Sequence, residues 1–530
     1  MKQQPRKAVS DMPEGLVEEA VRSPRSKVRS LDELADISRA AKQAGRTVVM
    51  AHGVFDLVHL GHVRHLAEAR HQGDLLIVTI TADRFVNKGP NRPVFTEQLR
   101  AEMLAALEQV DWVGINDAPT AEPILLSIAP DVYVKGPDYA SPADDITGGI
   151  DVERQTIEAH GGRLFITDDI SFSSSNLINR HLSVYDHRLT EYLDATRDET
   201  RLPRLMKLIE SVKDYKVLVV GDAIIDEYSY VTAMNKSPKE NMIATLFDHT
   251  EVFAGGVIAA ANHVASFCRQ VDIVTCLGRE SSREEEIRAS LKANVGLQVV
   301  WRETGPTTSK QRFVELGHLR KLFEVYLMDD TPLSGAAEQL MRDTVARLAP
   351  DYDLVIVTDF GHGAISQPTI DALQDRSRFL AVNAQTNSAN YGFNMITRYD
   401  RADYICIDAP EARLAAQDKH HEIPIVIEQG LRRRIDCDRL IITHGRNGCV
   451  TRDRDGQIGL IPAFTGTVVD TVGAGDAFLA VTSPLVATGA PMQDVGFIGN
   501  AAGALKVGIV GHSRSIEKVP LMKFVTSLLK

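Results

Sequence analysis

The sequence predicts an α/β protein made of two domains, each a largely parallel sheet covered by helices. Short apolar runs alternate with stretches of helical periodicity through most of the chain, which is typical of parallel sheets. Turns that contain glycine follow predicted strands in both halves. At 530 residues the chain is also longer than one typical domain.

The first half begins with a helix whose start is marked by a capping box. Ser30 can cap this helix, and Glu33 can reach back to the Ser30 amide. From Thr47 onward, strands are predicted at 48–51, 75–80, 111–115 and 132–134, and helices at 63–70, 98–109 and 177–182. We therefore expect a tail and one helix over residues 1–45, and a first domain over residues 46–185.

The second half begins with a charged segment, 186–214, that keeps apolar residues at helical spacing and predicts a helical connector. A second α/β unit then starts at a strand over 216–220. Further strands are predicted at 354–357 and 440–443. Residues 215–530 are therefore expected to form one larger α/β domain.

The composition excludes several classes of protein. Lys and Arg number 59 and Asp and Glu 71, so the net charge of −12 argues against non-specific nucleic-acid binding. No apolar run approaches the roughly 18 residues that span a bilayer, and no apolar stretch follows the N-terminal charges as in a secretory signal. The 5 cysteines form no CxxC pair, which favours reduced thiols. We expect a cytoplasmic protein with neither nucleic-acid nor membrane partners.

The most informative motif of the first half is His59-Leu60-Gly61-His62, between a predicted strand and a helix. The glycine lets the backbone approach a ligand, and a helix N-terminus favours anions, so both imidazoles can face one phosphate. Such donors suit attack on an α-phosphate, where charge develops on the phosphoryl oxygens. Two histidines in a turn are more often structural, so the residues around them decide the interpretation.

Polar residues follow several other predicted elements of this half. They lie in a glycine- and proline-containing loop after the next helical stretch, at a strand end where α/β sheets bind ligands, and before a helix: Lys88, Arg92, Lys135, Ser173, Ser174 and Ser175. Together with the histidine pair, they resemble the cytidylyltransferase-like nucleotidyltransferases over about residues 46–182. His65, one turn beyond His62, is expected to be a solvated helix residue.

This resemblance implies a Rossmann-like domain that uses ATP or CTP and Mg²⁺ without a covalent intermediate. A phosphate oxygen of the substrate attacks and pyrophosphate leaves. His59 and His62 would stabilise the reacting phosphates. The remaining residues implied to bind the nucleotide or the sugar phosphate are Gly53, Phe55, Lys88, Arg92, Lys135, Ser173, Ser174 and Ser175.

The most informative motif of the second half is the string Asp-Thr-Val-Gly-Ala-Gly-Asp over 470–476, followed by an apolar helix. Gly473, Ala474 and Gly475 permit a tight turn whose amides form an anion hole. Asp476 in that turn can accept a proton from a hydroxyl while the amides hold the transferring phosphoryl group. A lone GxG would be weak support, but the full string is much more specific.

This string resembles the ribokinase-like (PfkB) carbohydrate kinases, and other segments agree in order over about 215–530. The resemblance implies a kinase domain with a small β lid, ATP as donor and a homodimer through the lid. Asp226, Gly255, Gly256 and Lys310 would bind the sugar. Asp408 and Glu411 would lie near Mg²⁺, and Thr443 and Gly445 on the nucleotide side.

Three positions depart from that family's pattern. Ala259 replaces an asparagine that often follows the paired glycines, and Asp408 replaces the asparagine of the NxxE element. Residues 383–388 read Asn-Ala-Gln-Thr-Asn-Ser, where heptose kinases carry Asp-Pro-Lys. Loss of a charged pair there changes which substrate can be recognised.

The two halves together are similar to the bifunctional heptose 7-phosphate kinase / heptose 1-phosphate adenylyltransferase family, but in reversed order. We therefore expect a sugar or heptose-phosphate kinase joined to a sugar-1-phosphate nucleotidyltransferase, with adenylyl transfer favoured over cytidylyl transfer. Two alternatives remain open. The kinase-like domain could only bind ligand or dimerise, or the pair could activate a polyol or lipid-precursor phosphate.

Overall fold

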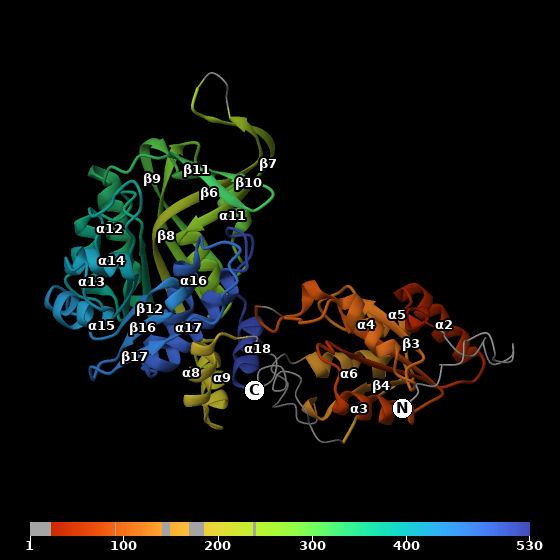
Figure 1. Cartoon of the computed structure of the whole chain (residues 1–530). Coiled ribbons are helices and arrows are strands. Elements are labelled where there is room, and N and C mark those ends of the chain that lie inside the picture. The colour runs from red at the N-terminus through yellow and green to blue at the C-terminus, as the bar shows by residue number, and fades with distance from the viewer. Residues whose placement is uncertain (1–22, 91, 140–148, 169–184, 237–239) are drawn as a thin grey trace, which may run out of the picture. The chain divides into compact units, whose positions relative to one another are not determined.

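The computed structural model describes residues 23–90, 92–139, 149–168, 185–236 and 240–530. It divides into two compact units, residues 1–184 and 185–529 (Figure 1). The predicted N-terminal tail up to residue 22 and the serines at 173–175 lie outside the described residues. Among the described helices, none combines the length and apolar character needed to cross a membrane.

The first unit contains a five-stranded parallel sheet with the order β3-β2-β1-β4-β5. Its strands are β1 (Val48–Gly53), β2 (Leu75–Thr81), β3 (Trp112–Asn116), β4 (Val132–Lys135) and β5 (Arg163–Ile166). Its helices are α2 (Leu31–Gln43), α3 (Leu60–Arg70), α4 (Glu97–Ala105), α5 (Glu122–Ile128) and α6 (Gly149–Ala159). The predicted capping box is present, since Ser30 and Glu33 bond each other's backbone amides at the start of α2.

The side chains of β1 point alternately into two apolar cores, one on each face of the sheet. Val49 and Ala51 face a core formed with α3 and α4. Val48 and Met50 face the opposite core, formed with α2, α5 and α6. Because successive strand residues point to opposite faces, a nearly continuous apolar strand is buried on both sides.

The second unit is built on a twelve-stranded sheet in which one long strand, β6 (Lys216–Lys236), serves two parts. Its first residues pair in parallel with β8 and β12 in the core. Beyond Asp222 it pairs with β7 and β10, which with β11 form a small lid sheet (Figure 1). The strands are β7 (Ile243–Gly256), β8 (Gln270–Glu280), β9 (Val295–Pro306), β10 (Ser309–Glu315), β11 (Arg320–Leu327), β12 (Leu354–Asp359), β13 (Leu380–Ala384), β14 (Tyr404–Asp408), β15 (Leu440–Thr443), β16 (Cys449–Arg452) and β17 (Ile458–Ile461).

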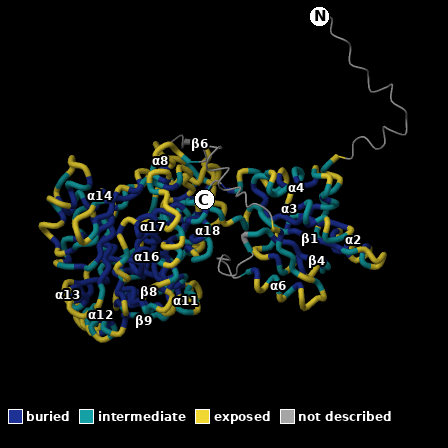
Figure 2. Tube along the Cα trace, turned by 90° about the horizontal axis from the view of Figure 1, so that it is seen from below, coloured by how far each residue is buried: buried dark blue, intermediate teal, exposed yellow. Residues whose placement is uncertain are grey.

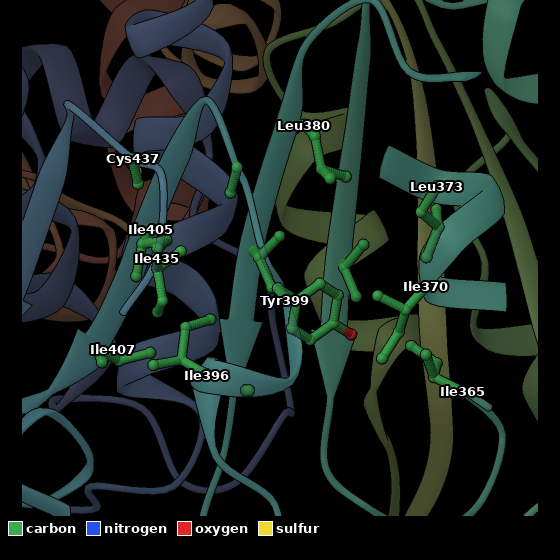
Figure 3. Packing of buried hydrophobic residues seen from close by; sticks show 14 of the residues in the cluster. Ile365, Ile370, Leu373, Leu380, Ile396, Tyr399, Ile405, Ile407, Ile435 and Cys437 are labelled. Carbon is green, nitrogen blue, oxygen red and sulfur yellow. The ribbon is translucent and has the colours of Figure 1, made fainter. Parts of the chain in front are cut away.

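Helices cover both faces of the core sheet. The longer helices are α8 (His187–Ala195), α9 (Arg201–Ser211), α10 (Val257–Ala265), α11 (Glu284–Ser290), α12 (Gly335–Leu348), α13 (Gln367–Arg376), α14 (Ala409–Ala416), α16 (Ala474–Ala487), α17 (Met492–Lys506) and α18 (Lys518–Leu529). On one face α12, α13 and α14 enclose a large apolar core that includes Ile370, Tyr399 and Ile405 (Figure 3). The other face is covered by α10, α16 and α17, and Figure 2 shows the buried residues gathered along the strands.

The segment predicted as a connector forms α8 and α9, and both belong to the second unit. Leu205 and Ile209 of α9 are fully buried. Arg204 donates from Nε to Asp494 Oδ2 of α17 at 2.7 Å. The boundary between the compact units therefore precedes this segment, whereas the predicted α/β class of both halves is confirmed.

The carboxyl ends of the parallel strands in the second unit meet at one edge. The register places Gly221 of β6 beside Thr358 of β12, and Asp408 of β14 beside Thr443 of β15. Ligands of open α/β sheets bind at this edge. The fold thus gathers the residues of β6 just beyond Gly221 and the residues that follow β12, β13, β14 and β15.

We predict that Gly221→Ala lowers the free energy of unfolding of the second unit by about 1–3 kcal/mol, because overpacking strains a filled interior. A Cβ at Gly221 would lie 2.2 Å from Thr358 Oγ1 and 2.3 Å from Thr358 O. Urea unfolding followed by Trp301 fluorescence in a Trp112→Phe background measures the change. Gly466→Ala is the matched control, since a Cβ there meets nothing within 4 Å; equal losses in both variants would contradict the packing argument.

Candidate active sites

The first candidate site lies where β1 ends and α3 begins. His59 is the N-cap of α3, and its Nδ1 accepts the Gly61 amide at 3.1 Å. The rings of His59 and His62 stack with centroids 4.0 Å apart, and Phe55 lies edge-on to His62 at 5.1 Å. Phe55 adopts φ 49°, in the left-handed region, and its ring lies beside Gly53, where a Cβ would come within 3.2 Å of it. The chain thereby holds both imidazoles side by side at a helix N-terminus.

Burial keeps the imidazoles of this site neutral. It lowers the pKa of His59, and it lowers the pKa of His62 to about 3 with help from the charges of His59, His65 and Lys88. His52, the residue before the last of β1, has its pKa lowered to about 3 by burial and by Lys135. Neutral imidazoles can donate hydrogen bonds to phosphoryl oxygens without adding a buried charge.

Arg92, predicted to meet a triphosphate, lies in a buried ion pair. Its Nη1 donates to Asp56 Oδ2 at 2.9 Å, and both side chains are almost fully buried. Asp56 Oδ1 also accepts the Val94 amide at 2.6 Å. The pair therefore anchors the loop after β2 to the residues after β1. Contact between Arg92 and a nucleotide stays a prediction, and it requires the Arg92–Asp56 pair to rearrange.

Lys135, at the end of β4, is likewise compensated within the unit. Its Nζ lies 2.8 Å from Glu153 Oε2, and it lies over the rings of Tyr133 and Tyr139. Burial disfavours its ammonium, but Tyr133, Tyr139 and Glu153 outweigh burial and raise the pKa of Lys135. The charge of Lys135 is therefore retained at the sheet edge that was predicted to bind a ligand. Lys88, the other lysine predicted for this site, is half-buried near His62.

His65 corrects an expectation, because it is not a solvated helix residue. Its Nδ1 lies 2.9 Å from Thr167 Oγ1, just beyond β5. Burial and the charge of Lys135 lower the pKa of His65 to about 4. Because residues three apart lie on the same face of a helix, His65 lies on the same side of α3 as His62. His65 thus belongs to the surroundings of the histidine pair.

The second candidate site lies where β6 passes from the core into the lid. Asp226 is buried, pairs with Arg312 of the lid strand β10, and lies 3.3 Å from His512 Nε2 through its Oδ2. Burial alone would raise the pKa of Asp226, but the His512 hydrogen bond and the Arg312 charge outweigh it and lower that pKa. The predicted sugar aspartate is therefore ionised and held in place. A Cβ on Gly255 would meet Asp226 Oδ2 at 2.2 Å, so the glycine permits close approach.

Lys310 supplies a second charge to this site and has no counter-ion in contact. It is 5% exposed and lies over the Tyr326 ring at 5.2 Å. No described residue forms a hydrogen bond or ion pair with its ammonium. Burial lowers the pKa of Lys310, while Asp226 and Asp222 oppose that shift. A buried ammonium without a hydrogen-bond acceptor is costly, so the site is suited to a ligand that supplies one.

The predicted phosphate turn forms the start of α16. Gly473 is its N-cap with φ 73°, and a Cβ at Gly475 would meet nothing within 4 Å. Asp476 lies in the first helical turn and is buried, and within the described chain its carboxylate forms no hydrogen bond or ion pair. Burial raises the pKa of Asp476, and the charges of Lys506 and Lys310 oppose the shift.

Asp408 and Glu411, predicted to lie near Mg²⁺, form a capping box at the start of α14. Asp408 Oδ1 accepts the Glu411 amide and Glu411 Oε2 accepts the Asp408 amide, both at 2.8 Å. Burial and the charge of Asp408 raise the pKa of Glu411 to about 8. Of the two residues predicted to face the nucleotide, Thr443 is the last residue of the neighbouring strand β15 and Gly445 lies beyond its end. The described residues contain no cluster of three or more His, Cys, Asp or Glu side chains able to hold a metal.

The departure at 383–388 corresponds to an asparagine-rich loop that binds the turn after β12. Asn387 and Asn390 each donate to Phe360 O at 2.8 Å, and Asn394 donates to Asp359 O at 2.9 Å. The Asn387 amide also lies 3.3 Å from His362 Nε2. Neutral amides therefore fill this segment and bind the turn after β12.

Sequence reasoning missed four residues of the second site. Asp222 accepts three backbone amides after β12, Arg312 and His512 hold Asp226, and Lys506 ties the segment of Gly511 to the phosphate turn. Arg312 lies two residues after Lys310 on the same predicted strand. Because residues two apart on a strand point to the same face, Arg312 could have been predicted beside Lys310. His512 and Lys506 lie in no recognisable motif, and only the tertiary fold brings them here.

Two family models match the chain. The model described as pfkB family carbohydrate kinase matches residues 214–519, and the model described as cytidylyltransferase-like matches residues 50–180. Their order along the chain is the one the motifs predicted. The matches include both histidines of the first site and the phosphate turn of the second.

Curated relatives match the first region. The "Bifunctional protein HldE" of Syntrophotalea carbinolica is 37% identical over 164 residues, 30% of this chain and 32% of the relative. That of Edwardsiella ictaluri is 42% identical over 154 residues, 29% of this chain and 31% of the relative. The chain thus spans about a third of the length of the curated relatives it matches. A Thermotoga maritima ribokinase structure aligns with 59% of this chain and 99% of its own length, at TM-score 0.46 and 18% identity.

We predict that acid destabilises the first unit through His52. Its pKa is about 3 in the folded unit against 6.5 in the unfolded chain, so below pH 6.5 the unfolded state binds a proton that the folded state does not. Stability conferred by neutral His52 is therefore present above pH 6.5 and declines as the pH falls. Between pH 7.5 and 5 the free energy of unfolding should drop by about 2 kcal/mol from this residue.

Urea unfolding followed by Trp112 fluorescence in a Trp301→Phe background measures this slope. His52→Gln should flatten the pH dependence by that amount. The exposed His71→Gln should leave it unchanged, and the same slope in the wild type and His52→Gln would refute the assignment.

Proposed function

The chain belongs to the pfkB family of carbohydrate kinases, and we propose that it is a bifunctional transferase of nucleotide-sugar synthesis. In this proposal, the second unit phosphorylates a sugar or sugar phosphate with ATP. The first unit joins a sugar 1-phosphate to a nucleotide and releases pyrophosphate. The cytidylyltransferase-like match over residues 50–180 supports the second activity.

The kinase proposal rests on the burial and the lack of a bonding partner of the Asp476 carboxylate. It is a buried carboxylate at a helix N-terminus, its pKa is raised by burial, and it forms no hydrogen bond or ion pair with a described residue. A general base requires such a group within reach of the acceptor hydroxyl. The turn amides at Gly473–Gly475 would stabilise the phosphoryl oxygens as the proton leaves for Asp476. Lys310, also without a hydrogen-bond acceptor, would bind the substrate's oxygens.

Mg²⁺ and ATP fit the carboxyl edge of the same sheet. Burial and the charges of Asp408 and Asp476 raise the pKa of Glu411, and a divalent cation bound beside Asp408 and Glu411 would relieve this repulsion. Such a cation neutralises charge on the donor phosphates when bound. Thr443 and Gly445 would face the nucleotide from the neighbouring strand end.

In the first unit, the histidine pair would hold the α-phosphate of the nucleotide. The stacked, neutral rings of His59 and His62 lie at the N-terminus of α3, where positive backbone dipoles favour an anion. Hydrogen bonds from the imidazoles would stabilise charge as the sugar phosphate attacks. The Lys135 ammonium and the serines 173–175 are proposed to contact the remaining phosphates.

For the substrate, we propose a heptose phosphate and adenylyl transfer, on the resemblance of residues 53–56 and 134–139 to the heptose family. The neutral asparagine loop at 383–394 allows a different sugar, because it lacks the charges of the heptose kinases. The 5 unpaired cysteines fit a reducing, cytoplasmic location.

A homodimer through the lid is supported by an apolar face on its strands. Phe323, Val325 and Leu327 are exposed on β11, while the alternating Glu324 and Tyr326 face inward toward Arg312 and Lys310. Ile243, Leu246 and Phe247 are exposed on β7. An apolar sheet face of this kind is costly to leave in water, and a second copy would cover it.

We predict that the two activities separate by mutation. Asp476→Asn should lower ADP formation roughly 100-fold or more, the usual contribution of a general base, and leave pyrophosphate release intact. His62→Asn should lower pyrophosphate release by a similar factor and leave ADP formation intact. Assays would use heptose phosphates, other sugar phosphates and polyols, each with ATP or CTP.

Unchanged ADP formation in Asp476→Asn would refute the role of Asp476 as general base, and a wild-type protein that forms no ADP would favour a ligand-binding or dimerising role. Turnover with a polyol but no sugar phosphate would favour the alditol alternative. Loss of both activities in either variant would indicate that the units do not act independently.

We predict that Phe323→Glu converts the dimer to a monomer, because it places a charge in the apolar lid face. Size-exclusion chromatography with light scattering measures the mass. Leu340→Glu, at an exposed apolar position on α12, is the control and should stay dimeric. A wild-type protein that is monomeric at all concentrations would contradict the lid interface.

A further inference from the structure

His512 lies in the second unit's site although no motif contains it. Its side chain is 4% exposed, and Nε2 lies 3.3 Å from Asp226 Oδ2. The ring fills space left by two glycines. A Cβ at Gly473 would lie 2.3 Å from its Cε1, and a Cβ at Gly255 would lie 3.2 Å from its Nε2. His512 therefore occupies the gap between the predicted sugar aspartate and the phosphate turn.

The backbone that carries His512 is fixed by the same motif that forms the turn. Lys506 Nζ, fully buried, donates to Val472 O and to Gly511 O, each at 2.7 Å. The Gly511 amide donates to Asp470 Oδ2 at 2.8 Å. Since Asp470 opens the Asp-Thr-Val-Gly-Ala-Gly-Asp string, the turn and the imidazole are held in one rigid arrangement.

One nitrogen of this imidazole has a partner and the other does not. With Nε2 donating its proton to Asp226, Nδ1 of the neutral ring carries a lone pair. Nδ1 is buried and has no hydrogen-bond partner in the part of the chain that the structure describes. A buried acceptor without a donor costs free energy. A ligand hydroxyl at this position would remove that cost.

We propose that His512 Nδ1 accepts a hydrogen bond from a second hydroxyl of the kinase acceptor, beside the hydroxyl that Asp476 deprotonates. This inference rests on the proposed kinase activity of the second unit. The His512 ring lies against Gly473, the N-cap of α16, and Asp476 lies in the first turn of that helix, so one acceptor can reach both. The site then selects polyhydroxylated acceptors, because an acceptor without the second hydroxyl would leave Nδ1 unpaired in the complex.

Two variants separate the roles of the two nitrogens. His512→Gln places a polar atom near the position of Nε2, so it can keep the contact with Asp226 while it removes Nδ1. His512→Asn places a polar atom near the position of Nδ1 and gives up the contact with Asp226. Steady-state kinetics of ADP formation would be measured with the best acceptor among hexose and heptose phosphates, alongside thermal unfolding of each full-length variant.

We expect His512→Gln to raise the KM for the acceptor at least 10-fold with the KM for ATP changed less than twofold. His512→Asn should keep the acceptor KM within threefold of wild type. Wild-type acceptor KM in His512→Gln would overturn the inference, and so would equal losses in both variants, since these indicate a role limited to holding Asp226. If His512→Gln does not fold, a loss above tenfold in a folded His512→Asn overturns it.

A wild-type protein that forms no ADP with any acceptor would instead overturn the kinase proposal itself. A second measurement uses the wild type alone, with singly deoxygenated forms of the best acceptor. One non-reacting position should cost at least tenfold in KM, and His512→Gln should lose that discrimination. Equal discrimination in the wild type and His512→Gln would overturn the role of Nδ1.

Discussion

The second unit depends on one strand, β6, that leaves the parallel core and continues into the lid. Its core residues pair with β8 and β12, and its outer residues pair with β7 and β10. Asp222 and Asp226 lie at this transition, and both are buried. Lid and core therefore meet at buried charges, and Arg312, His512 and Lys310 can compensate them only because the same strand spans both sheets.

The two sites handle buried charge in different ways. In the first unit, Arg92 pairs with Asp56 and Lys135 with Glu153, and the imidazoles are kept neutral by burial. In the second, Asp476 and Lys310 are buried without a hydrogen-bonded partner within the described chain, and burial raises the pKa of Asp476 and lowers that of Lys310. Buried unpaired groups cost stability and persist where a ligand completes them. This contrast supports phosphoryl transfer to a hydroxyl in the second unit, and phosphate binding by neutral donors in the first.

The sequence predicted both folds because short apolar runs alternate with helical periodicity and the turns carry distinctive residues. Strand 48–51, the helix after Ser30 and the start of α16 follow from periodicity, capping and glycine. The surroundings of the sites could not be predicted the same way. Asp56 lies 36 positions from Arg92 and His512 lies 286 positions from Asp226, so no local pattern records either contact. His65 was misplaced because its partner Thr167 is brought close only by the sheet.

The proposed kinase activity requires that the turn at 473–476 binds a phosphate and that an acceptor site lies beside it. A crystal structure of the full chain with Mg²⁺, a non-hydrolysable ATP analogue and a sugar phosphate tests this most directly. We expect the terminal phosphate to lie against the amides of Gly473–Gly475 and an acceptor hydroxyl to lie between Asp476 and His512. An analogue bound elsewhere in the second unit, with Asp476 paired to a protein side chain, would contradict it.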